Sequence, residues 1–293
     1  MSTPVAGTEL DPLFHQARQL ALLLGLSPEH LADERCADAF ALRHGRPPML
    51  GDEVPPWRYR GWLRLYVQAL HAGCERQTGF PDRWGYLREI MEERRLPERP
   101  IPQVSFGLAN RSVLKETDDW VGILDGKLGR WESFQKFVRF LAFGLAVSND
   151  DPGLPDDASE ALYRKVDLGK WLCHPSDYLG DVAQQRHGAG PDAYFSTPLE
   201  VAVMMARLTF GDGDHRLKTV CEPCVGSGGM LLAASNYTLR MAAQDKDEVL
   251  LLCCKVNLAV YAPWGLYDLG FLAATQAPAD EVLARQRALY PRL

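Results

Sequence analysis

Three glycines within four residues, Gly226, Gly228 and Gly229, separate two apolar segments of the chain. Residues 217–222 before them predict a buried strand, and residues 226–237 predict a glycine turn that feeds a helix. Glycine permits positive φ and lets the backbone approach a ligand closely. A strand that turns directly into a helix can offer backbone N–H groups to an anionic ligand. The plain alternative is a tight turn with no ligand.

The segment after the glycines favours the ligand-binding interpretation. Residues 239–244 predict a second strand, Asp245 and Asp247 follow it, and residues 245–262 predict a helix. An acid about 20 residues after a glycine turn is placed to bind ribose hydroxyls at the end of the second strand. A phosphate-binding loop of the ATPase type is excluded because no Gly-Lys-Ser/Thr follows.

The preceding part of the chain predicts mostly helix. We expect three regions: a helical N-terminal region over 1–100, a second helical region over 101–210, and a partial α/β unit over 211–293. Residues 96–105 hold three prolines and predict a linker. Asp157 is a candidate N-cap. The helices expected are 8–25, 58–74, 80–95, one starting at Trp131, 158–168, 175–187, 198–209 and 279–290.

These elements resemble N6-adenine DNA methyltransferases, especially the modification subunits of type I restriction systems. EPCVGSGG at 222–229 resembles motif I of that family. FSTP at 195–198 resembles its F-x-T-P element, AQDKD at 243–247 its motif II, and NLAVY at 257–261 the end of the next helix. The four elements occur in the order of the family.

The resemblance implies a truncated Rossmann-like methyltransferase fold, with S-adenosylmethionine as cofactor and DNA as partner. It implies that Gly226 and Gly228 cradle the amino-acid part of the cofactor. Asp245 would bind the ribose, with Asp247 as a helper or helix cap, and Glu222 would meet the ammonium or anchor the loop. The remaining residues of the implied site are Phe195, Thr197, Pro198 and Pro223.

The catalytic N/D/S-P-P-Y/F/W motif of the family does not occur after Asp247. The nearest tetrapeptide, VPPW at 54–57, starts with a valine that cannot accept a hydrogen bond through its side chain, so a proline turn is expected there. Only 32 residues follow Tyr261, so we expect an unfinished sheet. Two hypotheses remain: a DNA adenine-N6 methyltransferase that acts alone or with a partner subunit, or a catalytically inactive homologue that acts as a binding or regulatory accessory protein of a restriction, phage or plasmid system.

The composition of the chain limits which classes of protein and which cellular locations are expected. The net charge of -6 argues weakly against a dedicated nucleic-acid coat. We find no export signal and no apolar run long enough to span a membrane, so a cytoplasmic protein is expected. Seven scattered cysteines predict reduced thiols, and a metal site at Cys221 and Cys224 is not expected.

Overall fold

The computed structural model describes most of the chain from Pro55 to Leu272. The described residues are 55–58, 60–64, 66–68, 70–71, 79–126, 128–187 and 194–272. The expected helices 8–25 and 279–290 lie outside these residues, and the expected helix 58–74 lies only partly within them.

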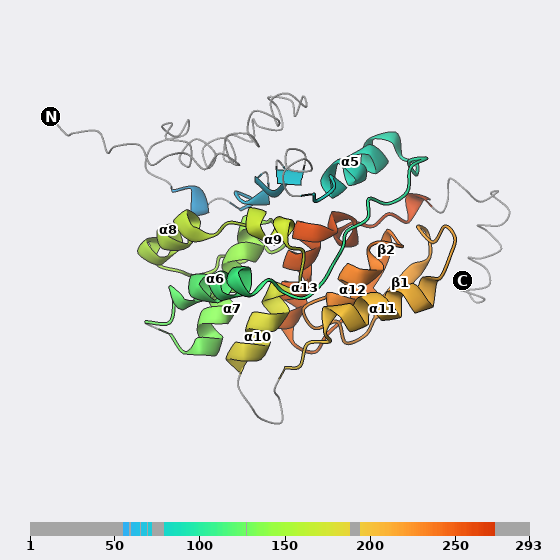
Figure 1. Cartoon of the computed structure of the whole chain (residues 1–293). Helices are drawn as coiled ribbons and strands as arrows, with labels where there is room; N and C mark the ends of the chain where they lie inside the picture. The colour runs from blue at the N-terminus through green and yellow to red at the C-terminus, as the bar shows by residue number, and fades with distance from the viewer. Residues whose placement is uncertain are drawn as a thin grey trace, which may run out of the picture.

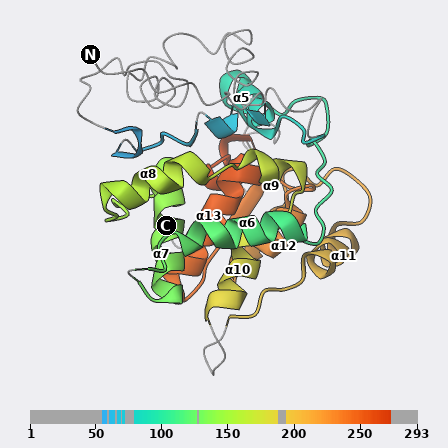
Figure 2. The ribbon, with the colours of Figure 1, turned by 60° about the vertical axis from the view of Figure 1, so that its left-hand side comes forward.

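Helices make up most of the described chain, and the two strands lie toward one side of the molecule, at the right in Figure 1; Figure 2 shows the same ribbon turned by 60°. The 3-10 helices are η1 (Pro56–Arg58) and η2 (Pro263–Leu266). The α-helices and strands, in chain order, are α5 (Arg83–Glu93), α6 (Arg111–Gly122), α7 (Arg130–Gly144), α8 (Asp156–Lys165), α9 (Gly169–Cys173), α10 (Tyr178–His187), α11 (Leu199–Phe210), β1 (Thr219–Glu222), α12 (Gly229–Ala234), β2 (Arg240–Ala243) and α13 (Glu248–Tyr261).

The two strands form a parallel pair joined through α12. The register runs from Thr219 opposite Arg240 to Glu222 opposite Ala243. Strand, glycine turn, helix, strand, acid and helix therefore follow in the order expected from the sequence, although each element is shorter than expected. In the described residues β1 pairs only with β2, so each strand has one edge without a neighbouring strand. An open edge carries unpaired backbone N–H and C=O groups.

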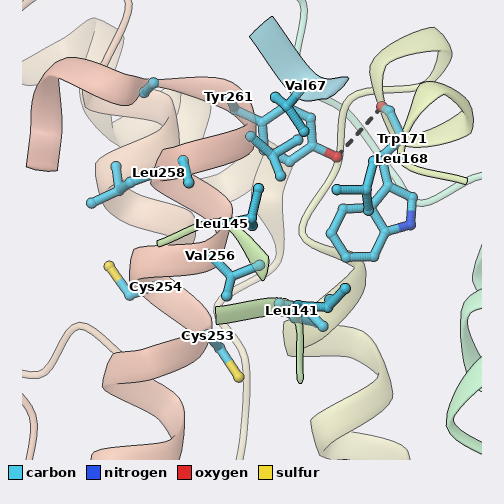
Figure 3. Packing of buried hydrophobic residues seen from close by; sticks show 14 of the residues in the cluster. Val67, Leu141, Leu145, Leu168, Trp171, Cys253, Cys254, Val256, Leu258 and Tyr261 are labelled. Atoms are coloured by element: carbon cyan, nitrogen blue, oxygen red, sulfur yellow. Dashed lines mark hydrogen bonds between the residues drawn. The ribbon is translucent and has the colours of Figure 1, made fainter. Parts of the chain in front are cut away.

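Helix α13 is the central element of the hydrophobic core. Ten of the thirteen residues from Val249 to Tyr261 are buried, and α13 packs most extensively against α7. Figure 3 shows Val256 directed toward Leu141 and Tyr261 directed toward Val67 and Trp171, and Tyr261 Oη lies 3.4 Å from the carbonyl oxygen of Trp171. A helix that is apolar on all sides is expected to be buried in this way.

Side chains from much earlier in the chain complete the C-terminal end of α13. Its last carbonyl groups have no partner within the helix. The carbonyl oxygen of Ala259 accepts from Trp84 Nε1 at 3.0 Å, that of Val260 from His71 Nε2 at 2.7 Å, and that of Tyr261 from Arg83 Nη1 at 3.1 Å. The start of α5 is thereby fixed to the end of α13.

Arg83 is fully buried, and its described partners are neutral groups. It also donates to Ser235 Oγ at 2.7 Å and to the carbonyl oxygen of Pro102 at 2.9 Å, and it lies 4.8 Å from the ring centre of Trp264. Burial lowers the pKa of Arg83 to about 9, so the group remains charged at neutral pH. Its place at the ends of α12 and α13 is favourable because helix C-termini carry partial negative charge.

One local expectation was wrong, and one helix was not predicted. Asp157 does not cap its helix: α8 starts at Asp156 after Pro155, whose extended backbone sets the helix boundary. Asp156 instead accepts from Trp57 Nε1 at 3.1 Å and Arg58 Nε at 3.0 Å. Helix α6, which the sequence analysis did not assign, is capped by the side chain of Asn110.

The prolines at 55 and 56 form the turn expected from the sequence. The N–H of Arg58 donates to the carbonyl oxygen of Pro55 at 3.0 Å, and the ring of Trp57 packs against Tyr163. Residues 96–105 contain no helix or strand, yet Val104 and Ile101 are buried in the common core. The three expected regions stay a prediction. Among the described residues, none of the helices has the length and apolarity to cross a membrane.

Candidate functional site

The glycine turn between β1 and α12 has the backbone conformation that requires glycine. Gly226 has φ 53° and Gly228 has φ 100°, both in the left-handed region. A Cβ atom on Gly228 would lie 2.9 Å from Cys254 Sγ and 3.3 Å from the Cα atom of the same residue. The turn therefore packs directly on α13, and Gly228 makes that contact possible.

The N–H groups of the turn, which the resemblance assigns to the cofactor, bond to the chain itself. This arrangement fixes the turn and differs from an open anion cradle. The N–H of Cys224 donates to Glu222 Oε1 at 3.2 Å, that of Val225 to the Gln244 carbonyl oxygen at 3.0 Å, and that of Gly226 to Asp245 Oδ2 at 2.7 Å. The N–H of Ser227 donates to Tyr194 Oη at 3.1 Å, and that of Gly228 to the Val225 carbonyl oxygen at 2.9 Å.

The three acids of the implied site have separate local roles. Glu222 accepts a hydrogen bond from the N–H of Cys224 and so anchors the turn, which is one of the two roles that the resemblance implies for it. Asp247 caps α13 by accepting from the N–H groups of Val249 and Leu250 at 2.8 and 3.1 Å. Asp245 accepts one backbone N–H on each oxygen, at 2.7 and 3.0 Å. A carboxylate has about four acceptor sites, so Asp245 keeps capacity for further donors.

A hollow of about 590 Å³ lies beside Asp245 and the glycine turn. This volume falls within the range of small-molecule sites. The lining combines carboxylates, one lysine and apolar side chains. The lining residues are His187, Tyr194, Phe195, Pro223, Cys224, Gly226, Gln244, Asp245, Lys246, Asp247 and Leu250.

The F-x-T-P segment borders the hollow at one end only. Phe195 lines it and remains 78% exposed. Thr197 and Pro198 are exposed and do not line it, and Pro198 leads into α11. Glu222 and Gly228 also lie outside the lining. The structure thus brings Phe195, Pro223, Gly226, Asp245 and Asp247 together around one space.

A buried polar network lies beneath the glycine turn and was missed by the sequence analysis. The carboxylate of Asp177 accepts from Ser227 Oγ, from the Gly180 N–H at 2.9 Å and from Asn257 Nδ2 at 2.8 Å. Asn257 Nδ2 also donates to the carbonyl oxygen of Ser227 at 2.8 Å. The network ties α10 and α13 to the turn.

Tyr194 joins this network from the opposite side. Because the hydroxyl hydrogen of Ser227 is directed to Asp177, the hydroxyl of Tyr194 donates to Ser227 Oγ at 2.7 Å. The same hydroxyl accepts from the Ser227 N–H. Tyr194 therefore covers the peptide between Gly226 and Ser227 on the side of the hollow.

Burial sets the protonation of the acids in this region. It raises the pKa of Asp177, which has no cationic partner among the described residues. Burial, with the charges of Asp177 and Glu200, raises the pKa of Asp181 to about 6. Burial also raises the pKa of Tyr194 to about 12, so its phenol stays protonated at neutral pH.

One local signal could have found Asp177. It precedes the first residue of α10, and its bond to the N–H of Gly180, three residues on, is typical of an N-cap aspartate. Its contacts with Ser227 and Asn257, 50 and 80 residues away, have no local sequence signal.

The described residues contain no group of three or more histidines, cysteines or acids arranged to hold a metal ion. Cys221 and Cys224 are free and exposed, whereas Cys253 and Cys254 are buried in α13. Comparisons with protein-family models, curated proteins and solved structures find no match to this chain.

Proposed function

We propose that this chain binds S-adenosylmethionine and is related to adenine-N6 DNA methyltransferases, with a partner needed for methyl transfer. The main support is the joint position of Asp245 and the glycine turn at one end of two parallel strands, beside the hollow. Ligands of open α/β sheets bind at this end of the strands.

The side chains that line the hollow fit the chemical groups of the cofactor. Asp245 offers acceptor sites to ribose hydroxyls, and the carboxylates of Asp245 and Asp247 favour an ammonium group. Phe195, Pro223 and Leu250 offer apolar surface to adenine. When bound, S-adenosylmethionine supplies an electrophilic methyl group. The catalytic tetrapeptide of the family does not occur after Asp247, so we assign acceptance of the proton of the target amine to the partner.

A calorimetric titration of the full chain with S-adenosylmethionine tests this proposal. We expect saturable binding that Asp245→Ala weakens about tenfold or more, because hydrogen bonds to charged groups contribute about 1.5–3 kcal/mol. Glu248→Ala is the matched control, since Glu248 is an exposed acid outside the hollow. Absence of binding by a folded protein, or equal affinity of the two variants, would contradict it.

The second candidate is a catalytically inactive homologue that acts through binding. Its support is the internal bonding of the turn N–H groups: an anionic ligand group at the Ser227 N–H must displace the hydroxyl of Tyr194. A transfer assay with tritiated cofactor on DNA lacking methyladenine separates the two. Transfer that appears on adding a partner subunit favours the first candidate, and cofactor binding without transfer in the presence of that partner favours the second.

A further inference from the structure

Helix α11 carries a stripe of large apolar side chains on its exposed face. Val201, Met204, Met205 and Leu208 are 39%, 54%, 44% and 77% exposed. Their spacing of three, four and seven residues places them on one face across two helical turns. We refer to these four residues as the α11 stripe.

The opposite face of α11 holds the helix on the protein. Ala202, Ala206 and Leu199 are buried, and α12 is the main neighbour of α11. Figures 1 and 2 both place α11 at the margin of the molecule. Four of the larger apolar residues of this helix thus lie on the side away from the core, whereas Leu199 is buried and Val203 and Phe210 are partly buried. A continuous exposed apolar surface of this kind indicates an interaction site.

We infer that a second copy of this chain covers the α11 stripe, with the two α11 helices packed antiparallel about a two-fold axis. A two-fold interface requires a patch that is complementary to itself. The α11 stripe meets this requirement because its spacing reads the same from either end of the helix. Two methionines lie at its centre, and one aliphatic residue lies three positions beyond them on each side. Antiparallel packing centred between Met204 and Met205 sets Val201 against Leu208 of the second copy.

The charges beside the stripe fit the same arrangement. Glu200 and Arg207 lie at opposite ends of α11, and both are exposed. Neither has an ion-pair partner among the described residues, and Glu200 is coupled to the like charge of Asp181. In the antiparallel pair Glu200 lies within about one turn of Arg207 of the second copy. Parallel packing would place like charges together.

Sedimentation equilibrium of the full chain measures this association. We expect a reversible dimer that dissociates in the micromolar range, because a contact built on one helix lies at the small end of stable interfaces. Leu208→Glu is expected to weaken it about 100-fold or more, since each dimer would bury two charges in apolar surroundings. Leu108→Glu is the matched control: Leu108 is 80% exposed and lies outside α11.

A charge reversal tests the antiparallel orientation. Glu200→Arg and Arg207→Glu should each weaken the dimer about fivefold, because each affects two symmetry-related exposed pairs that contribute about 0.5 kcal/mol apiece. The double variant restores both pairs and should return the affinity to within about twofold of the unmodified chain.

Three results would overturn the inference. The first is a chain that stays monomeric at several hundred micromolar. The second is a dimer that Leu208→Glu leaves intact. The third is a monomer in which Leu208→Glu lowers the midpoint of urea unfolding well below that of Leu108→Glu, because that result shows a segment of the same chain covering the stripe.

Discussion

The guanidinium of Arg83 donates to the carbonyl oxygen of Tyr261, the last residue of α13, with 3.1 Å between Nη1 and the oxygen. This bond joins two residues 178 positions apart. It belongs to a set of contacts in which the first turn of α5 satisfies the end of the central helix.

Replacing Arg83 with methionine is expected to destabilise the protein by about 3 kcal/mol, because buried acceptors lose their donor at about 1–3 kcal/mol each. Urea unfolding of the full chain measures the loss. Arg88→Met is the control, since Arg88 lies on the same helix, is half-buried and is expected to change stability by less than about 0.5 kcal/mol. Equal midpoints for the two variants would show that the acceptors find other donors.

His71 is expected to make the protein sensitive to acid. Burial lowers the pKa of His71 to about 3, so the ring is neutral when folded and donates from Nε2 to Val260. The unfolded chain binds the proton near pH 6.5, whereas the folded chain does not. Stability from this group is therefore present above pH 6.5 and is lost as the pH falls from about 6.5 to about 3.

The measurement compares the free energy of unfolding of the unmodified chain with that of His71→Gln across this pH range. Glutamine keeps a donor and an acceptor but does not titrate. The difference between the two proteins should change by about 1.4 kcal/mol per pH unit within the range. A difference that is independent of pH would mean that His71 is charged in the folded state.

Asp177 and Asp181, one helical turn apart, should respond to amide substitution in opposite ways. Asp177→Asn leaves one amide oxygen for three donors, so at least one buried donor loses its partner, at a cost of about 1–3 kcal/mol. Asp181→Asn removes a charge whose burial is unfavourable, so the stability at pH 7 should stay equal or rise. Urea unfolding at pH 7 compares them, and a larger loss for Asp181→Asn would contradict the assignment of the network.

Alanine at position 228 should disturb the contact between the glycine turn and α13. Both the φ of 100° and the approach to Cys254 oppose a Cβ atom, and we expect a loss of about 2–4 kcal/mol. Gly126→Ala serves as the control, because a Cβ atom there meets no atom within 4 Å. Thermal unfolding that is the same for both variants would show that the turn adapts without cost.

The local order of the α/β unit could be predicted from the sequence because it depends on neighbouring residues. Apolar runs, the glycines and Asp247 each specify a strand, a turn or a helix start within a few positions. Helix α6 also had such a signal, with Asn110 as cap and Val113, Thr117 and Trp120 on one buried face. The buried face of α6 includes Thr117, so the difference in polarity between its two faces is smaller than in a helix with only apolar residues on one face.

The contacts that organise the site could not be predicted in this way. Asp177 and Asn257 meet only after α10 and α13 pack together, and no spacing in the sequence encodes that pairing. The exposed face of α11 is a similar case. Apolar residues surround much of this helix, so the sequence predicts the helix but not that the alanines turn inward and the methionines outward.

The side-chain cap of α13 has a consequence for how the chain is made. The donors His71, Arg83 and Trp84 leave the ribosome long before their acceptors at 259–261 are synthesised. The first turn of α5 must therefore stay unengaged until the central helix emerges, and the two then close a loop of nearly two hundred residues. A fragment that begins at β1 would expose three helix carbonyls and the apolar flank of α13, so excising the α/β unit is a poor route to a smaller soluble protein.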